Sequence, residues 1–381
     1  MKEKALLLLM FLILCSARPV GPEWGFYGHR KINRMAVFSL PWEMFGYYKQ
    51  NIEFLTVHAV DPDKRRYATR HEAVRHFIDI DHWGENPFEE VPHKYWEAIL
   101  KYSEPILVKA GDSTRISLEE IKSSFASEDI QLIKSIIEYQ PDENPFEIPL
   151  STGDVFYVND VFTEFGNLPY WLKQYQERLT KAFELNNEKR ILRISAEMGH
   201  YIGDAHVPLH TTENYNGQMT NQVGIHAFWE SRIPELFADA EYDFMVGKAE
   251  YIKDLDQYFW DVIEDSHILL KDVLAIEKEL TESFPSDKQW CYDDRKEYTL
   301  RLQCPEFAKA YALRMDGMVE KRMREAILSL SSLWYTAWVN AGQPDLNVLG
   351  KVVLSDEDRK KQKELELQFE SGNIFGREHG K

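Results

Sequence analysis

Long amphipathic stretches constrain the fold of this chain more than any other feature of its sequence. Over residues 177–204 the chain is rich in Leu, Ala, Glu, Lys and Arg, and apolar residues recur every three or four positions. This spacing indicates an α-helix with one buried face. Similar patterns cover residues 117–139, 249–280 and 308–338, and Gly342-Gln343-Pro344 forms a stop after the last of these. Strand-like runs are few and short, so we predict an all-α protein built as a single large helical domain.

The N-terminus has the pattern of an export signal. Residues 1–4 carry two lysines, an apolar run follows over residues 5–15, and Cys15-Ser16-Ala17 is a stretch of small residues suited to cleavage. The apolar run is too short to span a bilayer, and Arg18-Pro19 ends it. We therefore expect a signal peptide over residues 1–17, with cleavage as late as residue 23 as the alternative. The mature protein would be exported, whether periplasmic, secreted or bound at the cell surface.

The overall composition narrows the class of protein. With 44% hydrophobic and 13% aromatic residues, the chain is too apolar to be disordered. Its net charge of −18 disfavours a broad basic surface that binds a polyanion, but not a site that holds phosphate through metal ions. Export permits a disulfide between Cys291 and Cys304, and two free buried thiols are the alternative. Residues 344–381 form a charged tail, and the dense charges at 356–366 are typical of a solvated helix or of disorder.

Histidines and acidic residues recur at spacings that suit metal ligands. His200 and Asp204 are four residues apart, so they share one face of the predicted helix, and His210 lies just beyond the Pro208 that ends it. His226 and Glu230 form a second pair at the same spacing. A surface contact on a helix would explain either pair alone. Two such pairs so close together, in apolar and aromatic surroundings, favour a zinc site.

Two simpler metal motifs do not fit. The segment from His71 to His76 resembles the H-E-x-x-H zinc helix but contains one residue too many. Five residues rotate about 500° along a helix, so these two imidazoles would diverge by about 140°. The chain also contains no His-Asp dipeptide, which excludes the HD-type phosphohydrolases.

Taken in order along the chain, these residues resemble the trinuclear-zinc superfamily that joins bacterial zinc-dependent phospholipase C to the single-strand nucleases called S-one and P-one. The segment from His200 to His210 is close to the most recognisable segment of that family. The resemblance runs from Trp24 to about Glu235, and the helix that ends near Asn340 is similar to the last core helix of the family. It implies a domain over residues 24–343, with insertions at about 83–187 and 241–305. Residues of suitable type stand at all nine ligand positions: Trp24, His29, Asp61, His76, His200, Asp204, His210, His226 and Glu230.

The resemblance implies three zinc ions and a role for each of these residues. One ion would be held by Asp61, His76, His200 and Asp204. Asp204 would bridge to a second ion, held also by His29 and by the backbone amine and carbonyl of Trp24. The third would be held by His210, His226 and Glu230. His206 lies about 240° around the helix from His200, so we assign it to capping or supporting work.

One departure from the family concerns Trp24. There the tryptophan begins the mature protein and its free α-amine is a zinc ligand, whereas cleavage after Ala17 would leave six residues in front of Trp24. The resemblance therefore implies either processing directly before Trp24 or a different set of ligands at that ion.

The implied activity is hydrolysis of a phosphodiester by zinc-activated water, with Asp61 orienting the water or accepting its proton. Glu230 and the short gap between His210 and His226 favour a phospholipase C-like enzyme, which would imply transient contact with a membrane surface.

The spacing of Trp24 and His29 favours the alternative, a single-strand nuclease. Phe77 and Asp79 could stack on and hydrogen-bond to a base, but both types also occur on the phospholipase side. A second alternative is a secreted zinc-binding protein without catalysis, and we expect no obligate protein partner.

Overall fold

The structure, a computed structural model, describes residues 26–139, 144–295, 298–372 and 374–377. Helices make up most of it, as the sequence predicts, and two small antiparallel sheets accompany them. Within the part of the chain that the structure describes, no helix is both long enough and apolar enough to cross a membrane. The expected signal peptide and Trp24 lie outside the described residues, and both stay predictions.

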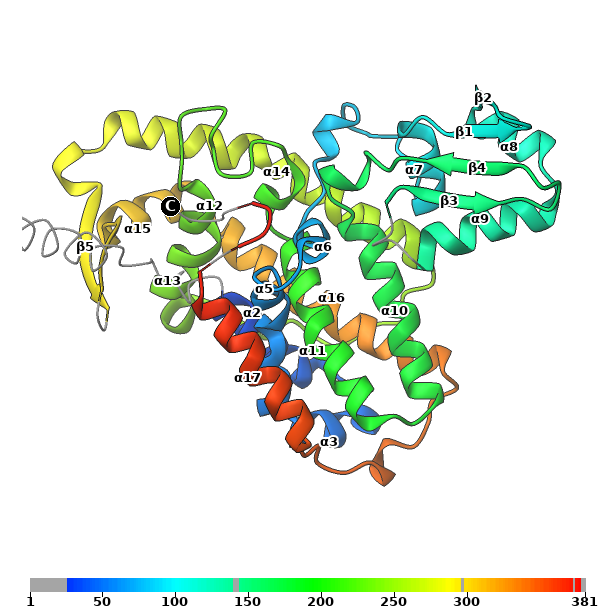
Figure 1. Cartoon of the computed structure of the whole chain (residues 1–381). Coiled ribbons are helices and arrows are strands. Elements are labelled where there is room, and N and C mark those ends of the chain that lie inside the picture. The colour runs from blue at the N-terminus through cyan, green and yellow to red at the C-terminus, as the bar shows by residue number, and fades with distance from the viewer. Residues whose placement is uncertain (1–25, 140–143, 296–297, 373, 378–381) are drawn as a thin grey trace, which may run out of the picture.

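Helix α11 (Glu188–Ala205) runs through the middle of the fold (Figure 1). Asn187 caps its start by accepting a hydrogen bond from the backbone N–H of Arg190 at 3.1 Å. From Ser195 to Ala205 every residue of the helix is buried. Polar side chains on this stretch must therefore find partners inside the protein. The helices that pack against α11 include α2 (Phe26–Ala36), α4 (Ile52–Val57), α10 (Leu168–Glu184) and α16 (Met318–Asn340).

Three of the helical stretches predicted as continuous are divided in two. Residues 117–139 fall in α8 (Leu118–Ser124) and α9 (Ser127–Tyr139), which are separated at residues 125–126. The other two stretches are divided at residues with left-handed backbone conformations. Residues 177–204 fall in α10 and α11, which are separated at Asn186, whose φ is 47°. Residues 308–338 fall in α15 (Pro305–Arg314) and α16, separated by Asp316 and Gly317 with φ of 50° and 75°. A left-handed residue cannot continue a right-handed helix, so the chain turns at both points. The other helices are α3 (Trp42–Gln50), α5 (Asp61–Arg65), α6 (Arg70–Ala73), α7 (Tyr95–Tyr102), α12 (Ile225–Ala227), α13 (Ile233–Glu241), α14 (Leu255–Ser283) and α17 (Asp356–Glu370).

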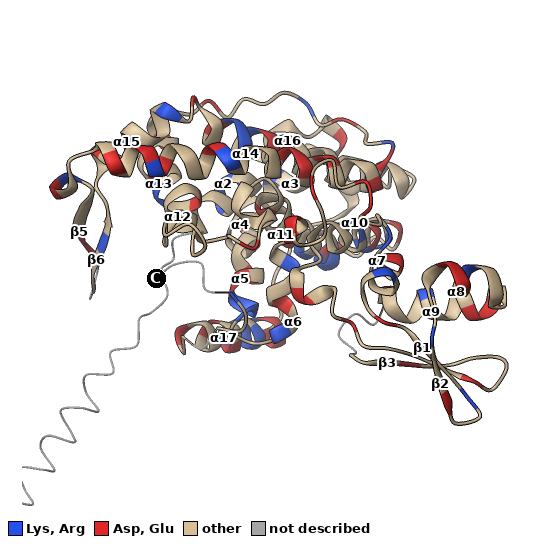
Figure 2. Cartoon of the chain, turned by 90° about the horizontal axis from the view of Figure 1, so that it is seen from above, with Lys and Arg blue, Asp and Glu red and all other residues tan. Residues whose placement is uncertain are grey.

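Two small sheets, which the all-α expectation did not include, accompany the helices. Strands β1 (Ile106–Lys109), β2 (Asp112–Arg115), β3 (Phe146–Pro149) and β4 (Val155–Val158) form an antiparallel sheet in the order β2-β1-β4-β3. Strands β5 (Trp290–Arg295) and β6 (Tyr298–Gln303) form a hairpin, and a disulfide joins Cys291 to Cys304 at its base. The sheets lie at opposite ends of the molecule (Figure 1 and Figure 2). Both fall within the stretches expected as insertions, yet α10, in the first of these stretches, packs in the core.

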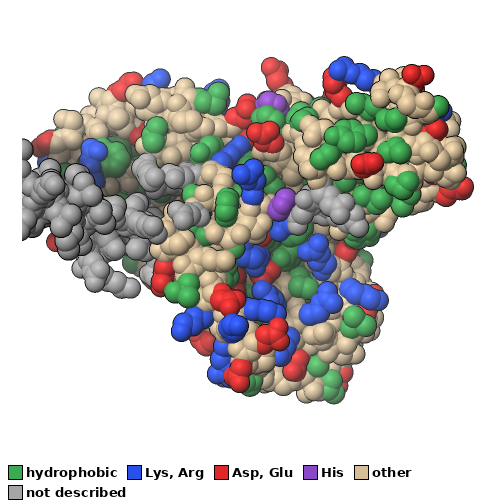
Figure 3. Space-filling model, viewed as in Figure 1, with side chains coloured by type: hydrophobic (Ala, Val, Ile, Leu, Met, Phe, Trp, Pro, Cys, Tyr) green, Lys and Arg blue, Asp and Glu red, His purple; other side chains and the backbone are tan. Residues whose placement is uncertain are grey.

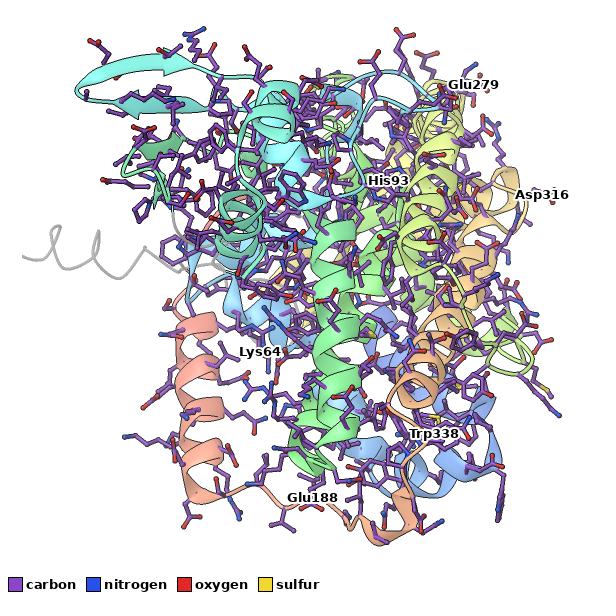
Figure 4. All side chains as sticks on the ribbon, turned by 90° about the vertical axis from the view of Figure 1, so that its right-hand side faces the viewer. Lys64, His93, Glu188, Glu279, Asp316 and Trp338 are labelled. Carbon is purple, nitrogen blue, oxygen red and sulfur yellow. A yellow bond between two sulfur atoms is a disulfide. The ribbon has the colours of Figure 1, made fainter. Side chains whose placement is uncertain are left out.

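The densely charged part of the tail, residues 356–366, folds into helix α17. Ser355 and Asp358 form a reciprocal capping box at its start. Near its end, Phe369 is buried against the rings of Phe26 and Tyr67. Lys64 reaches from α5 toward α17 (Figure 4), where its ammonium donates to Glu366 at 2.6 Å. The helix is therefore solvated on one side, as expected, but its last turns are packed against the domain.

A buried ion-pair network fixes α5 against α11. The guanidinium of Arg65 donates to both carboxylate oxygens of Glu197, at 2.8 and 3.2 Å. Tyr175 and Arg193 donate to the same carboxylate at 2.6 and 3.1 Å. Burial alone would raise the pKa of Glu197, but the two guanidiniums and the tyrosine hydroxyl together lower it to about 2. Arg65 also donates to the buried Glu72, so the network holds in place the segment that carries His76.

We expect Glu197→Gln to lower the free energy of unfolding by about 3 kcal/mol at pH 7, because it leaves buried cations without their partner. Since the folded-state pKa of Glu197 is depressed, its contribution is complete above the unfolded value near ~4.3 and is lost as pH falls toward about 2. The loss caused by the substitution should therefore be smaller at pH 3 than at pH 7 in urea titrations. The control is Glu177→Gln, at an exposed position on α10. An equal loss for Glu197→Gln at both pH values would contradict this account.

Candidate metal centre

Seven predicted ligands gather around the C-terminal half of α11, although they come from distant parts of the chain. Their donor atoms form overlapping groups, and within each group these atoms lie no more than 4.8 Å apart. The segments that carry them are α2, α11, two 3-10 turns at Val74–His76 and Pro208–Thr211, α12, and a π-helical turn at Phe228–Arg232. A π turn inside a helix is often found at functional sites. The seven residues are His29, His76, His200, Asp204, His210, His226 and Glu230.

The first group of donor atoms lies around His200 and Asp204, which share one face of α11. His200 Nε2 lies 3.0 Å from His76 Nδ1, and Asp204 Oδ2 lies 2.9 Å from the same His76 atom. Asp63 Oδ1 approaches His200 Nε2 to 3.6 Å. Two donors bonded to one zinc ion at 2.0–2.2 Å in tetrahedral geometry would be separated by about 3.4 Å. The distances in this group therefore match a shared ion.

The second half of the cluster continues from the other oxygen of Asp204. Oδ1 of Asp204 lies 3.3 Å from His29 Nε2, which in turn lies 3.4 Å from Glu230 Oε1. Glu230 Oε2 lies 2.9 Å from His226 Nε2 and 3.6 Å from His210 Nε2. Asp204 thus turns one oxygen to each half of the cluster, which is the arrangement required of a carboxylate that bridges two ions.

Backbone carbonyls set the orientation of two of the imidazoles. His200 Nδ1 donates to the carbonyl oxygen of Ala59 at 3.0 Å, and His226 Nδ1 donates to that of Tyr215 at 2.9 Å. In a neutral imidazole the proton on Nδ1 leaves the lone pair on Nε2. Both rings therefore direct a lone pair into the cluster, as metal-binding histidines do. Glu72 has a related position behind His76, with Oε1 at 3.8 Å from its Nε2.

Two glycines of α11 allow α2 to approach closely enough to place His29. A Cβ at Gly203 would lie 2.8 Å from His29 Nδ1, and a Cβ at Gly199 would lie 1.7 Å from Asn33 Oδ1. The amide of Asn33 donates to the carbonyl oxygens of Leu55 and Ala196, both at 2.9 Å, and so ties α2 to its neighbours. Gly199 and Gly203, one helical turn apart, are therefore explained by the close packing of α11 against α2.

The electrostatics of the cluster fit a bound cation. Burial, aided by the charges of Glu230 and Asp63, raises the pKa of Asp204 well above its ordinary value. Burial lowers the pKa of His200 well below 6.5 and that of His210 to about 4, so both imidazoles are neutral at pH 7. Crowded carboxylates beside neutral imidazoles are costly alone, and a divalent cation relieves that cost. The residues therefore fit zinc, which takes nitrogen and oxygen ligands.

The aspartate of the first group is Asp63 rather than the predicted Asp61. Asp61 Oδ2 accepts a hydrogen bond from His58 Nδ1 at 2.6 Å, and the groups of donor atoms do not include it. Asp63 and Asp61 are two residues apart on α5, so they point about 200° apart around the helix. The His58–Asp61 spacing of three residues is the one sequence signal that could have shown Asp61 to be paired elsewhere. Glu72 is the other residue of the site that the sequence analysis did not single out.

His206 lies at the edge of the centre. It is the C-cap residue of α11, and its Nδ1 donates to the carbonyl oxygen of Ile202 at 2.7 Å. Its Nε2 lies 3.2 Å from Ser329 Oγ. The cluster of donor atoms does not include His206, which matches the capping or supporting work assigned to it from its helical position. Trp24 lies outside the described residues, so its contribution stays a prediction.

Asp79 and Phe77 form a second feature close to the cluster, and we call the slot the position where one group contacts both the carboxylate of Asp79 and the ring of Phe77, as the guanidinium of Arg377 does. Both side chains are buried, and they stand one and three residues after the predicted ligand His76. The backbone N–H of Ile78 donates to the carbonyl oxygen of His210 at 2.9 Å, so this segment is tied to ligands on two sides. A Cβ at Gly166 would lie 2.2 Å from the carbonyl oxygen of Phe77, so only glycine fits against this segment.

We compared the chain with protein-family models, with curated proteins and with solved structures, and none of the three comparisons gave a match.

Proposed function

We propose that this protein is a zinc-dependent hydrolase of phosphodiesters, with up to three ions held by the cluster around α11. The observation that carries the proposal is the position of Asp204, whose two oxygens face two sets of imidazole and carboxylate donors. Sites with several adjacent ions are typical of enzymes that act on phosphate esters. The ordered resemblance of the ligands to the trinuclear-zinc phosphodiesterases supports the same activity.

We assign the following chemical roles to the residues of the site. Zinc ions at this position would neutralise the phosphodiester charge and lower the pKa of bound water toward ~7. Asp63, with its side chain 21% exposed, is the ligand that faces outward, so it is placed to orient the attacking water or to accept its proton. His29, Asp204 and Glu230 hold the inner, more buried part of the site. The formal charge of −18 does not oppose this function, because three ions would add +6 at the site.

Among substrate classes, the slot favours single-stranded nucleic acid. A carboxylate below an aromatic ring suits a planar group with N–H donors, such as a nucleobase. A choline head group has no N–H to donate to Asp79. The phospholipase C-like alternative, with its transient membrane contact, rests on Glu230 and on the short gap between His210 and His226. Lys and Arg side chains gather over α17 and α11 on the face shown in Figure 3. Their positive charge would attract either a nucleic acid strand or an anionic membrane surface.

The protein would act outside the cytoplasm. The disulfide between Cys291 and Cys304 supports this part of the proposal, because such bonds persist in oxidising compartments. The N-terminal sequence pattern supports it independently. N-terminal sequencing of the exported protein tests both the export and the expected start of the mature chain.

Hydrolysis of bis-p-nitrophenyl phosphate by the purified protein, with and without a chelator, tests the activity itself. We expect turnover that the chelator removes and zinc restores. Absence of zinc-dependent turnover would contradict the proposed hydrolase activity and would favour a zinc-binding protein without catalysis. Parallel assays with single-stranded DNA and with phosphatidylcholine then separate the two substrate classes.

A further inference from the structure

The last described residues of the chain return to the slot beside the metal centre. We call residues 375–377 the C-terminal strap. The backbone N–H of Phe375 donates to the carbonyl oxygen of Arg66 at 2.9 Å, and the guanidinium of Arg66 donates to the carbonyl oxygen of Arg377. Arg66 lies next to the proposed ligand Asp63, with 3.5 Å between its Nη1 and Oδ1 of Asp63. Figure 1 shows this red segment rising from the end of α17 toward α6 and α12.

The side chain of Arg377 occupies the slot. Its guanidinium donates to both carboxylate oxygens of Asp79, one of them at 2.7 Å, and the side chain of Asp79 is fully buried. The guanidinium carbon lies 3.6 Å from the ring centre of Phe77 and 4.7 Å from that of Tyr215. A forked pair of hydrogen bonds combined with stacking on an aromatic face holds an arginine side chain strongly.

Two further features hold the strap in this position. Gly376 has a φ of 86°, and a Cβ there would lie 2.5 Å from Cβ of Ala73, so the backbone passes close to the wall of the site. Helix α17 is anchored by the burial of Phe369 and by the pair between Lys64 and Glu366. The strap is therefore delivered to the slot from a fixed point only a few residues away, which gives a high effective concentration.

We propose that the C-terminal strap is an intramolecular plug, which fills the slot through Arg377 and must leave before a substrate group can enter it. The guanidinium resembles a nucleobase in the properties that favour binding in the slot. It is planar, it stacks on Phe77, and its N–H groups donate to Asp79. Arg377 occupies the slot whatever substrate group competes with it. Only the identity of the competing substrate group rests on the proposed function.

The plug lowers the apparent affinity for a substrate by the fraction of molecules in which the slot is open. If the strap is released in about one molecule in ten, the apparent affinity falls about tenfold. A substrate that does not enter the slot, such as bis-p-nitrophenyl phosphate, should be affected much less.

Trypsin cleavage after Arg377 tests the occupancy without any assay of activity. Trypsin must bind the arginine side chain, which is 18% exposed in the folded protein. In the full chain, we expect Asp79→Asn to speed this cleavage about tenfold, because cleavage follows the population of the open form. Cleavage after Arg359, whose side chain is 63% exposed on α17, is the internal reference and should not change. Equally fast cleavage after Arg377 in both proteins would overturn the plug.

Kinetics of the full-length Arg377→Ala variant test the consequence. We expect KM for a single-stranded oligonucleotide to fall about tenfold, with KM for bis-p-nitrophenyl phosphate little changed. Arg359→Ala, which removes an exposed arginine from the same tail, is the matched control and should behave as the wild type. An unchanged or increased KM for the oligonucleotide would overturn the plug, and an increase would show that Arg377 helps to bind substrate. If no phosphodiester is hydrolysed by either protein, the proposed function fails, and the trypsin result still decides whether Arg377 fills the slot.

Discussion

Replacing Asp204 with alanine is expected to remove most of the bound metal and to lower phosphodiesterase activity by ~10³-fold or more. Its two oxygens face both halves of the cluster and lie 2.9 Å from a nitrogen of His76, 3.3 Å from one of His29 and 3.9 Å from one of His210. The measurements are zinc content by mass spectrometry and kcat/KM for bis-p-nitrophenyl phosphate. Circular dichroism checks that the fold is kept, because a buried carboxylate is being removed.

His206→Ala is the control for this substitution. His206 lies two residues along the same helix and is equally buried, but it contacts the carbonyl oxygen of Ile202 and Ser329 rather than the donor atoms. We expect this variant to keep its zinc and most of its activity. Equal losses of zinc and activity for His206→Ala and Asp204→Ala would contradict the assignment of the ligands.

A second large effect is expected from Asp63→Asn, in contrast to Asp61→Asn. Asp63 approaches His200 and His76, at 3.6 and 3.9 Å, whereas Asp61 is paired with His58. Asn keeps the shape of Asp but removes its charge. We therefore expect Asp63→Asn to lose zinc and to lower activity by ~10²-fold or more, because a charged ligand of the first group is lost.

Asp61→Asn should keep both the zinc and most of the activity, because its amide oxygen can still accept the hydrogen bond from His58. The two variants differ by two positions in one short helix, so general effects on folding are closely matched. The opposite ranking, with the larger loss at Asp61, would favour the ligand set implied by the family resemblance over the geometry of this structure.

The pairing of His200 with Asp204 was predictable because helical periodicity fixes which side chains share a face. Both residues lie on α11 and face the same group, and Pro208 begins the turn that carries His210, as expected. His226 and Glu230 also meet, although a π turn replaces the regular helix there. The residues that share a face of one helix can therefore be predicted from their spacing, because this depends on local geometry alone.

Other features depend on contacts that no local pattern encodes. The choice between Asp63 and Asp61 is set by how α5 is rotated against α11, which the Arg65–Glu197 pair helps to fix. The breaks at Asn186 and Asp316 come from left-handed residues inside stretches with helical periodicity. The two sheets are built from strands too short to stand out in the sequence. The return of Arg377 to Asp79 joins residues 298 positions apart and could be found only from the fold.

We expect the cluster around α11 to hold several metal ions. The most direct test is the molar ratio of zinc to protein in the purified full chain, measured by inductively coupled plasma mass spectrometry after removal of loosely bound metal. We predict at least two zinc ions per chain, and a sharp decrease in Asp204→Ala. A ratio below two in the wild-type protein would contradict the account.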